Sequence, residues 1–290
     1  MAVNKADPKF LQDFLAHRFS LSRRTAKAMI DGRNVWVNRK CVWIARFALE
    51  TGDVVEVPSQ VVKGAVRQSA RTAPGAPVPA AARRHVRVLW SNDSYLVCDK
   101  PSGLVSCDDP KSVEAILREQ ESVPTLEAVH RLDRDTTGCL LFAKNHAAFE
   151  AAVEVFKTRR VSKVYHAIVA GQFKFVHQLI DTPLDGQPAV SRVTREAAGA
   201  DASFLRVRID TGRTNQIRRH LSSVRFPILG DRVFGLKSAR DPRLMQVPRQ
   251  MLHASTLELP DPMNPHAEIK AHSPLPADFR ATLRLFGMGK

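Results

Sequence analysis

Residues 130–138 read HRLDRDTTG, so two aspartates and two arginines lie within nine residues. The segment CLLFAKN that follows is an apolar run typical of a buried strand. Charge this dense beside a hydrophobic strand fits a solvated turn, a structural ion-pair cluster or a site of chemistry. A carboxylate fixed in such a place can act as a nucleophile or a general base. The residues alone leave these three interpretations open.

The rest of the chain lacks the signatures of most cofactor and metal enzymes. It contains no glycine-rich dinucleotide or phosphate-binding loop, and neither HExxH nor GxSxG occurs. The ten histidines are dispersed without ligand spacing, so we expect His166 and His253 to be packed or at the surface. Asp108 and Asp109 precede a proline and indicate a solvated turn rather than a metal site. We therefore expect no metal and no cofactor.

Four ordered blocks connect the charged segment with a known family. The segment AVHRLDRDTTGCLLFAKN closely resembles the catalytic motif of the RluA-type pseudouridine synthases. Three further segments resemble motifs of this family in the same order, namely VLWSNDSYLVCDKPSGL, VSKVYHAIVAG and DTGRTNQIRRHL…PILGD. The resemblance covers about 88–279. The chain departs from the family pattern at Thr137, where serine is usual, and at Asn215, where histidine is frequent.

The resemblance implies that the protein isomerises uridine to pseudouridine within an RNA chain. The reaction breaks the bond between ribose C1′ and uracil N1, turns the base and joins C5 to C1′. It needs a carboxylate at the sugar, a group that holds the detached base and an acceptor for the C5 proton. No electrons change hands, so the reaction requires no redox cofactor.

The motif matches assign three catalytic residues. Asp133 matches the catalytic aspartate of the family, and Arg218 matches the arginine that faces it and offsets its desolvation. Tyr165 matches the active-site tyrosine, which can stack on the uracil and take the C5 proton, although a core tyrosine is the simpler alternative. The covalent step stays open between attack at C1′, attack at uracil C6 and proton removal from C2′.

The roles expected for three further charged residues of these motifs are less specific. Arg131 matches a residue that fills the gap left in the RNA when the uridine flips out, and its alternative role is a salt bridge to Asp135. Lys163 shares a strand face with Tyr165 and is expected either to contact RNA or to be structural. Asp135 is expected to be structural, in a turn where its side chain bonds backbone amides.

The elements that must position these residues alternate irregularly from residue 85 onward. We predict strands at 85–90, 95–100, 138–144, 161–171 and 204–212, and helices at 112–120, 147–157 and 215–224, the last capped by Thr214. Leu205, Val207 and Ile209 are expected on one face of their strand. This order predicts an α+β catalytic domain over 85–290 with a mostly antiparallel mixed sheet.

A small α/β module is expected at 8–57. Asp7 followed by Pro8 predicts a helix N-terminus, and Ser22 and Gly32 would bound a second helix, followed by a hairpin and a closing strand. The module resembles the S4 RNA-binding domain, above all in LSRRTAKAMIDGRNVWVN. This resemblance implies that the second helix grips RNA, with Arg23, Arg24 and Lys27 near its start. A small solvated helix pair is the alternative.

Composition and charge set the remaining expectations. Residues 58–84 are rich in Ala, Pro and Arg and predict a disordered or partly extended basic linker. The net charge of +15 favours a polyanionic partner, and RNA ranks above a membrane surface. Ribosomal RNA is slightly favoured over transfer RNA, because an S4-like module suits a large folded substrate.

The cellular setting and two rival functions complete these expectations. Scattered cysteines and an N-terminus without an apolar segment predict a cytoplasmic protein, and we expect a monomer. The alternatives to a synthase are a non-catalytic RNA-binding protein of the same fold and an N-glycosidase that releases uracil. Carbodiimide labelling with primer extension would distinguish the three.

Overall fold

The computed structural model describes residues 2–4, 7–19, 21, 23–31, 34–42, 47–58, 61–62, 85–158 and 160–289, with the backbone alone at 23, 24, 28, 31, 40 and 41. Its contacts divide the chain into two compact units, Met1–Arg83 and Arg84–Lys290. Most of the predicted linker, 58–84, lies outside the described residues, as do Ser22 and Gly32. Each unit has its own apolar core and is treated separately below.

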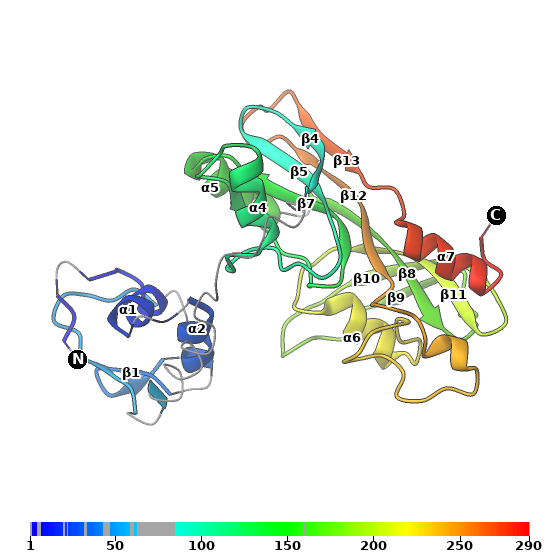
Figure 1. The fold of residues 1–290 in the computed structure, drawn as a ribbon, viewed down its shortest axis with the longest axis horizontal. Helices are drawn as coiled ribbons and strands as arrows, with labels where there is room; N and C mark the ends of the chain where they lie inside the picture. The colour runs from blue at the N-terminus through cyan, green and yellow to red at the C-terminus, as the bar shows by residue number, and fades with distance from the viewer. Residues whose placement is uncertain are drawn as a thin grey trace, which may run out of the picture. The chain divides into compact units, whose positions relative to one another are not determined.

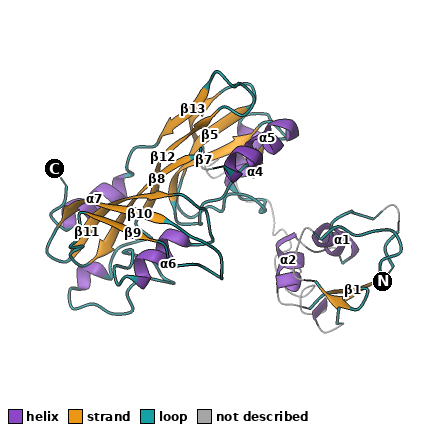
Figure 2. Ribbon diagram, turned by 180° about the vertical axis from the view of Figure 1, so that it is seen from behind, coloured by secondary structure: helices purple, strands orange, loops and turns teal. Residues whose placement is uncertain are grey.

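In its described residues, the N-terminal unit combines helical segments with a small antiparallel sheet (Figure 2). Its elements are α1 (Leu11–Arg18), α2 (Arg23–Asp31), β1 (Trp36–Val37), β2 (Lys40–Cys41) and β3 (Val55–Glu56). Strand β1 pairs with both β2 and β3. Leu11, Phe14, Leu15 and Ile30 are fully buried between the elements. The predicted second helix, hairpin and closing strand are all present.

The prediction for the start of the first helix was wrong. Helix α1 begins at Leu11, and its N-cap residue Phe10 has an extended backbone that pairs with Ala48. The Asp7 carboxylate accepts a hydrogen bond from the backbone N–H of Asn4 at 2.8 Å and caps no helix. An isolated β-bridge to a residue distant in sequence therefore outweighs the local Asp-Pro signal.

The second unit is built on a ten-stranded mixed sheet (Figure 1). Its strands are β4 (Arg87–Ser91), β5 (Tyr95–Lys100), β6 (Glu127–Ala128), β7 (Thr137–Ala143), β8 (Ser162–Ala170), β9 (His177–Ile180), β10 (Ser191–Ala198), β11 (Ala202–Ile209), β12 (Leu252–Pro260) and β13 (Glu268–His272). The order is β4-β5-β7-β12-β8-β11-β10-β9, with β13 beside β12 and β6 beside β7. Only β7 and β12 pair in parallel among the described strands. The predicted α+β class with a mostly antiparallel sheet is confirmed.

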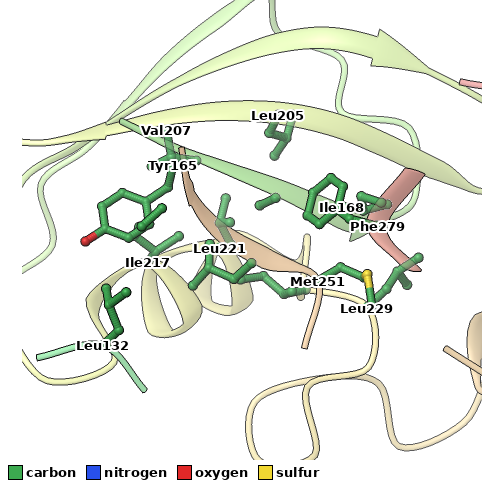
Figure 3. Close-up of a cluster of buried hydrophobic side chains, with 14 of the residues drawn as sticks. Leu132, Tyr165, Ile168, Leu205, Val207, Ile217, Leu221, Leu229, Met251 and Phe279 are labelled. Carbon is green, nitrogen blue, oxygen red and sulfur yellow. The ribbon is translucent and has the colours of Figure 1, made fainter. Parts of the chain in front are cut away.

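Helices cover parts of this sheet. They are α4 (Val113–Gln120), α5 (His146–Lys157), α6 (Gln216–Ser223) and α7 (Ala277–Leu285), with a 3-10 turn at Pro242–Leu244. Leu205, Val207 and Ile209 are buried and Arg206 and Arg208 exposed, which confirms the predicted alternation in β11. Figure 3 shows Val207 and Tyr165 beside Ile217 and Leu221 of α6. The central strands and α6 thus enclose one core, and the site lies at its edge.

Candidate active site

A buried lysine fixes the loop that carries Asp133. Lys100 ends β5, is fully buried, and donates through Nζ to the backbone oxygens of Pro101, Arg134 and Thr136 at 2.9, 2.9 and 3.0 Å. Burial lowers the pKa of Lys100 to about 8. The ammonium is retained in the interior because it satisfies carbonyl groups that a tight turn leaves unpaired. Sequence reasoning missed this residue, although it lies in the CDKPSGL block.

Side-chain hydrogen bonds hold both ends of the same loop. The Ser106 hydroxyl donates to the backbone oxygen of Leu132 at 3.0 Å and accepts from its N–H at 2.9 Å. Gln250 Nε2 donates to Thr136 Oγ1 at 2.7 Å, and both residues are buried. The residues on either side of Asp133 are therefore bonded to two other segments of the chain, which restricts the positions of its carboxylate.

The end of the motif is determined by contact with β12. Gly138 has φ +109°, and a Cβ there would lie 2.1 Å from the backbone oxygen of Ala254. Thr137 Oγ1 lies 2.9 Å from Nδ1 of the buried His253. The Thr137 departure from the family pattern is accommodated, since its hydroxyl has a partner. His253 is packed, as the sequence predicted.

Asp133 and Arg218 form an ion pair, with Arg218 Nη1 3.0 Å from Asp133 Oδ2. The other guanidinium nitrogens bond Asp231 in a bidentate pair at 2.7 and 2.9 Å. Arg218 Nη1 also donates to Asn215 Oδ1 at 2.6 Å, and its guanidinium lies 5.0 Å from the Phe234 ring centroid. Burial lowers the pKa of Arg218, but the bonds to Asp231 and Asp133 outweigh burial and leave it raised. The guanidinium is thus permanently charged and fixed beside Asp133.

Asp231 is the residue that sequence reasoning should have singled out and did not. Its side chain is 1% exposed and accepts from the backbone N–H groups of Val233 and Phe234 at 2.9 and 3.0 Å. Burial raises its pKa, but hydrogen bonds from Arg218 and these amides outweigh burial and leave the pKa below its usual range. The only signal was its place in the PILGD block.

The segment before α6 corrects the predicted cap. The N-cap residue is Asn215, not Thr214, and its backbone is left-handed with φ 54°. Asparagine tolerates this conformation, and its side-chain oxygen faces Arg218 instead of capping the helix. Gln216 Oε1 accepts from Thr211 Oγ1 and from the N–H of Arg213 at 2.8 and 3.0 Å. The side chain of Gln216 therefore stabilises the turn that precedes α6.

These elements meet around a cavity of about 70 Å³. Four of the predicted residues line it, namely Arg131, Asp133, Tyr165 and Arg218. Tyr165 is 7% exposed, and burial, followed by the charge of Asp133, raises its pKa. In Figure 3 its hydroxyl points away from the apolar cluster. The cavity therefore contains a carboxylate, its cation and a protonated phenol.

Comparison with known proteins decides the family. The profile described as RNA pseudouridylate synthase matches residues 94–223, and that described as S4 domain matches residues 11–55. Ribosomal large subunit pseudouridine synthase D of Pseudomonas aeruginosa is 34% identical over 233 residues, covering 69% of this chain and 71% of that protein. The chain belongs to the RNA pseudouridylate synthase family. Ribosomal large subunit pseudouridine synthase C of Vibrio cholerae is 30% identical over 271 residues, which cover 86% of this chain and 84% of that protein.

Solved structures show the same fold for this pseudouridine synthase. Human RNA pseudouridylate synthase domain containing 1 has a TM-score of 0.58 at 24% identity and covers 68% of this chain and 86% of that chain. Human RNA pseudouridylate synthase domain containing 4 has a TM-score of 0.59 at 22% identity and covers 68% and 92%. The sheet described above is thus the fold of this family.

Other predicted site residues of the synthase lie outside the cavity lining. Lys163 Nζ lies 5.6 Å from the ring centroid of Phe156, and burial lowers the pKa of Lys163. The Asp135 carboxylate lies 3.3 Å from Arg134 Nη2. Among the described residues it bonds no backbone amide, so that expectation was wrong, and it makes no ion pair with Arg131, so the alternative role of Arg131 is not observed. Asp135 instead forms a pair with its neighbour at the surface.

The remaining predicted residues belong to the N-terminal unit of the synthase. Arg23, Arg24 and Lys27 lie on α2, where Lys27 is exposed and the first two are described by backbone alone. Within the described parts of the chain, no three acidic, His or Cys side chains gather as a metal site requires. No helix there is long and apolar enough to span a membrane.

Proposed function

We propose that this synthase isomerises uridines of large-subunit ribosomal RNA, with Asp133 as the reacting carboxylate. The observation that carries the assignment of the site is the 3.0 Å ion pair between Asp133 and Arg218 beside Tyr165 in one cavity. The substrate class is supported by the names of the relatives, several of which are ribosomal large subunit synthases. The net charge of +15 suits such a polyanion.

The cavity residues divide the chemistry among them. Asp133 acts at the uridine, and attack at C1′, attack at C6 and removal of the C2′ proton all begin at its carboxylate. Arg218 holds this carboxylate in one orientation through the 3.0 Å ion pair while the RNA excludes water. Tyr165 stacks on the detached uracil. Its raised pKa keeps the phenol protonated at neutral pH, so Tyr165 must pass its own proton to solvent before it takes the C5 proton.

RNA recognition is assigned to residues around the cavity and to the first unit. Arg131 is exposed at the cavity and occupies the space that the flipped uridine leaves in the RNA. The S4-like unit, 8–57, binds folded RNA through α2, including Arg23, Arg24 and Lys27. Lys163 Nζ lies beside Gly212, where an added Cβ would be 3.5 Å away, so Lys163 packs on the loop before α6 and contacts RNA only indirectly. The enzyme acts as a cytoplasmic monomer without a cofactor.

Replacing one carboxylate oxygen tests the reaction directly. Asp133→Asn keeps the shape of the side chain but removes its charge, so pseudouridine formation should become undetectable while RNA affinity stays within about threefold, less than 1 kcal/mol. The measurement is single-turnover carbodiimide labelling with primer extension on a large-subunit ribosomal RNA transcript. The exposed Asp93 provides a matched Asp→Asn control that should retain full activity. Turnover by Asp133→Asn, or release of free uracil by the wild type, would contradict the proposal.

A further inference from the structure

One face of the sheet carries arginines that the active site does not use. Successive residues of a strand point to opposite faces, so Arg206 and Arg208 of β11 point away from the core that contains Val207 and its cross-strand partner Tyr165. Helix α7 packs on part of this second face, where the rings of Phe279 and Phe204 lie 6.1 Å apart. The part that carries the arginines remains exposed.

The exposed part of this face is hollowed. An open hollow of about 400 Å³ lies over β9, β10 and β11 and is lined by Arg192, Arg206 and Arg208 together with His177, Leu179 and Thr194. A second hollow of about 450 Å³ shares Arg192 and Arg208 and adds Asp210. We call Arg192, Arg206 and Arg208 with these two spaces the arginine hollow.

The arrangement of charge in the arginine hollow is unfavourable without an anion. Arg192 and Arg208 are direct cross-strand partners, and like charges directly opposite destabilise a sheet. Arg192 Nε donates to Asp210 Oδ2 at 3.0 Å, and Arg206 Nε lies 2.7 Å from Glu196 Oε1. No ion pair is made by Arg208 within the described parts of the chain. Two carboxylates therefore neutralise two of the three guanidinium groups, and the charge of Arg208 is left without an ion-pair partner there.

We propose that the arginine hollow binds backbone phosphates of the substrate RNA, at a distance from the flipped uridine. Guanidinium groups match phosphate oxygens in a bidentate geometry, and Arg192 and Arg206 each keep further N–H donors beyond their carboxylate bonds. Their exposed side chains, 58% and 51%, are accessible to a ligand as large as RNA. The protein already acts on RNA, so the same polyanion supplies the phosphates.

The hollow and the active site are adjacent along the chain. Ile209 lines the active-site cavity, whereas the preceding Arg208 lines the arginine hollow, so the two sites occupy opposite faces at the end of β11. RNA that flanks the target uridine reaches the second face by passing the edge of the domain at β9. This contact requires a long folded RNA, since a short hairpin that fills the cavity ends before it.

A charge-neutralising double variant tests the proposal in the full-length protein. Arg192→Gln/Arg208→Gln should weaken filter binding of a large-subunit ribosomal RNA transcript by about tenfold, equal to 1.4 kcal/mol. The slope of log affinity against log salt should flatten by about 1.4, because two phosphate contacts are lost. The single-turnover rate at saturating RNA, and binding of a short hairpin substrate, should not change.

Two matched variants make the result decisive. Arg280→Gln/Arg284→Gln removes the same charge from exposed positions on α7 and should leave affinity and salt slope unchanged. Arg192→Lys/Arg208→Lys keeps the charge and should retain the salt slope, which excludes a general loss of folding. Equal weakening by both Gln variants would show that only net charge matters and overturn the proposal. Loss of self-association or of binding to an acidic protein, with RNA binding intact, would overturn it in favour of a protein interface.

Discussion

Arg218 of helix α6 and Arg208 of strand β11 lie on opposite sides of the same sheet, and they differ in exposure and in the number of their partners. The Arg218 side chain is 10% exposed, and its guanidinium nitrogens bond Asp133, Asp231 and Asn215. Arg208 is exposed and lines an open hollow. A buried cation must be fully paired because its desolvation is costly, whereas an exposed cation keeps its donors for a ligand. The first arrangement suits a fixed catalytic group and the second suits a polyanion that arrives and leaves.

The largest effect expected from this comparison follows removal of the buried cation. Arg218→Ala should abolish turnover and destabilise the catalytic unit by about 3–5 kcal/mol, because Asp231 remains buried without its partner. Urea unfolding and single-turnover assays measure the two effects. The matched control is Arg219→Ala on the same helix, whose partner Asp185 is 74% exposed, so the loss of this pair should change the stability little.

A second variant separates the catalytic from the structural role of this cation. Arg218→Ala/Asp231→Ala removes both buried charges and should recover part of the stability while remaining inactive. If the Arg218→Ala enzyme were stable and turned over at a near-normal rate, Arg218 would be neither a structural nor a catalytic cation, and its contrast with the exposed Arg208 would have no functional meaning.

The next effect concerns binding by the first unit. Deletion of 1–60 should weaken binding of the ribosomal RNA transcript by about tenfold or more and flatten its salt dependence, since phosphate contacts release counterions. The single-turnover rate at saturating RNA should change by less than about twofold, within 0.4 kcal/mol. Filter binding and single-turnover labelling test this division. A truncated protein that binds normally but has lost its chemical step would contradict it.

A smaller effect should appear in the pH dependence of stability. Burial, followed by the charge of Lys163, lowers the pKa of His130 to about 3, and its Nε2 accepts from the N–H of Leu141 at 3.2 Å. Between the ordinary pKa of about 6.5 and 3, the unfolded chain binds a proton that the folded chain does not. The free energy of unfolding should therefore fall as the pH is lowered through this window, by up to about 1.4 kcal/mol per pH unit from this residue.

His130→Gln should reduce that slope in urea unfolding followed between pH 7 and pH 4. His146→Gln, at a position where the side chain is 76% exposed, provides the control and should leave the slope unchanged. An identical slope in the wild type and His130→Gln would show that other groups cause the acid sensitivity.

The smallest effect is expected at the second aspartate of the HRLDRDTTG segment. Among the described residues, the Asp135 carboxylate pairs only with Arg134, whose side chain is 60% exposed, so the pair contributes less than about 1 kcal/mol. Asp135→Asn should keep turnover within about threefold of wild type, as single-turnover labelling would show. A well-folded but inactive Asp135→Asn would mean that the reacting carboxylate was assigned to the wrong residue.

Strand and helix types were predicted where the local pattern was strong. The alternation in β11 and the apolar run in β7 gave the correct elements, because burial of one or both faces determines such patterns. Helix starts were predicted less well. Phe10 forms a β-bridge with Ala48, which is distant in sequence and is not recognisable from neighbouring residues. Asn215 bonds the nearby Arg218, but the position of that guanidinium is set by Asp133 and Asp231, which are distant in sequence or outside the helix.

The sequence by itself determined the family, through four ordered motifs, and with it the expected chemistry, for which Asp133, Tyr165 and Arg218 are the proposed residues. Tertiary structure alone decided how their charges are balanced. Asp231 and Lys100 lie 98 and 33 positions from Asp133 in sequence, yet one pairs with the same arginine and the other bonds the same loop. Pairing of buried charges depends on distances in space, and the folded sheet sets those distances. For the same reason, the neighbouring arginines of β10 and β11 became one hollow only when the strands paired.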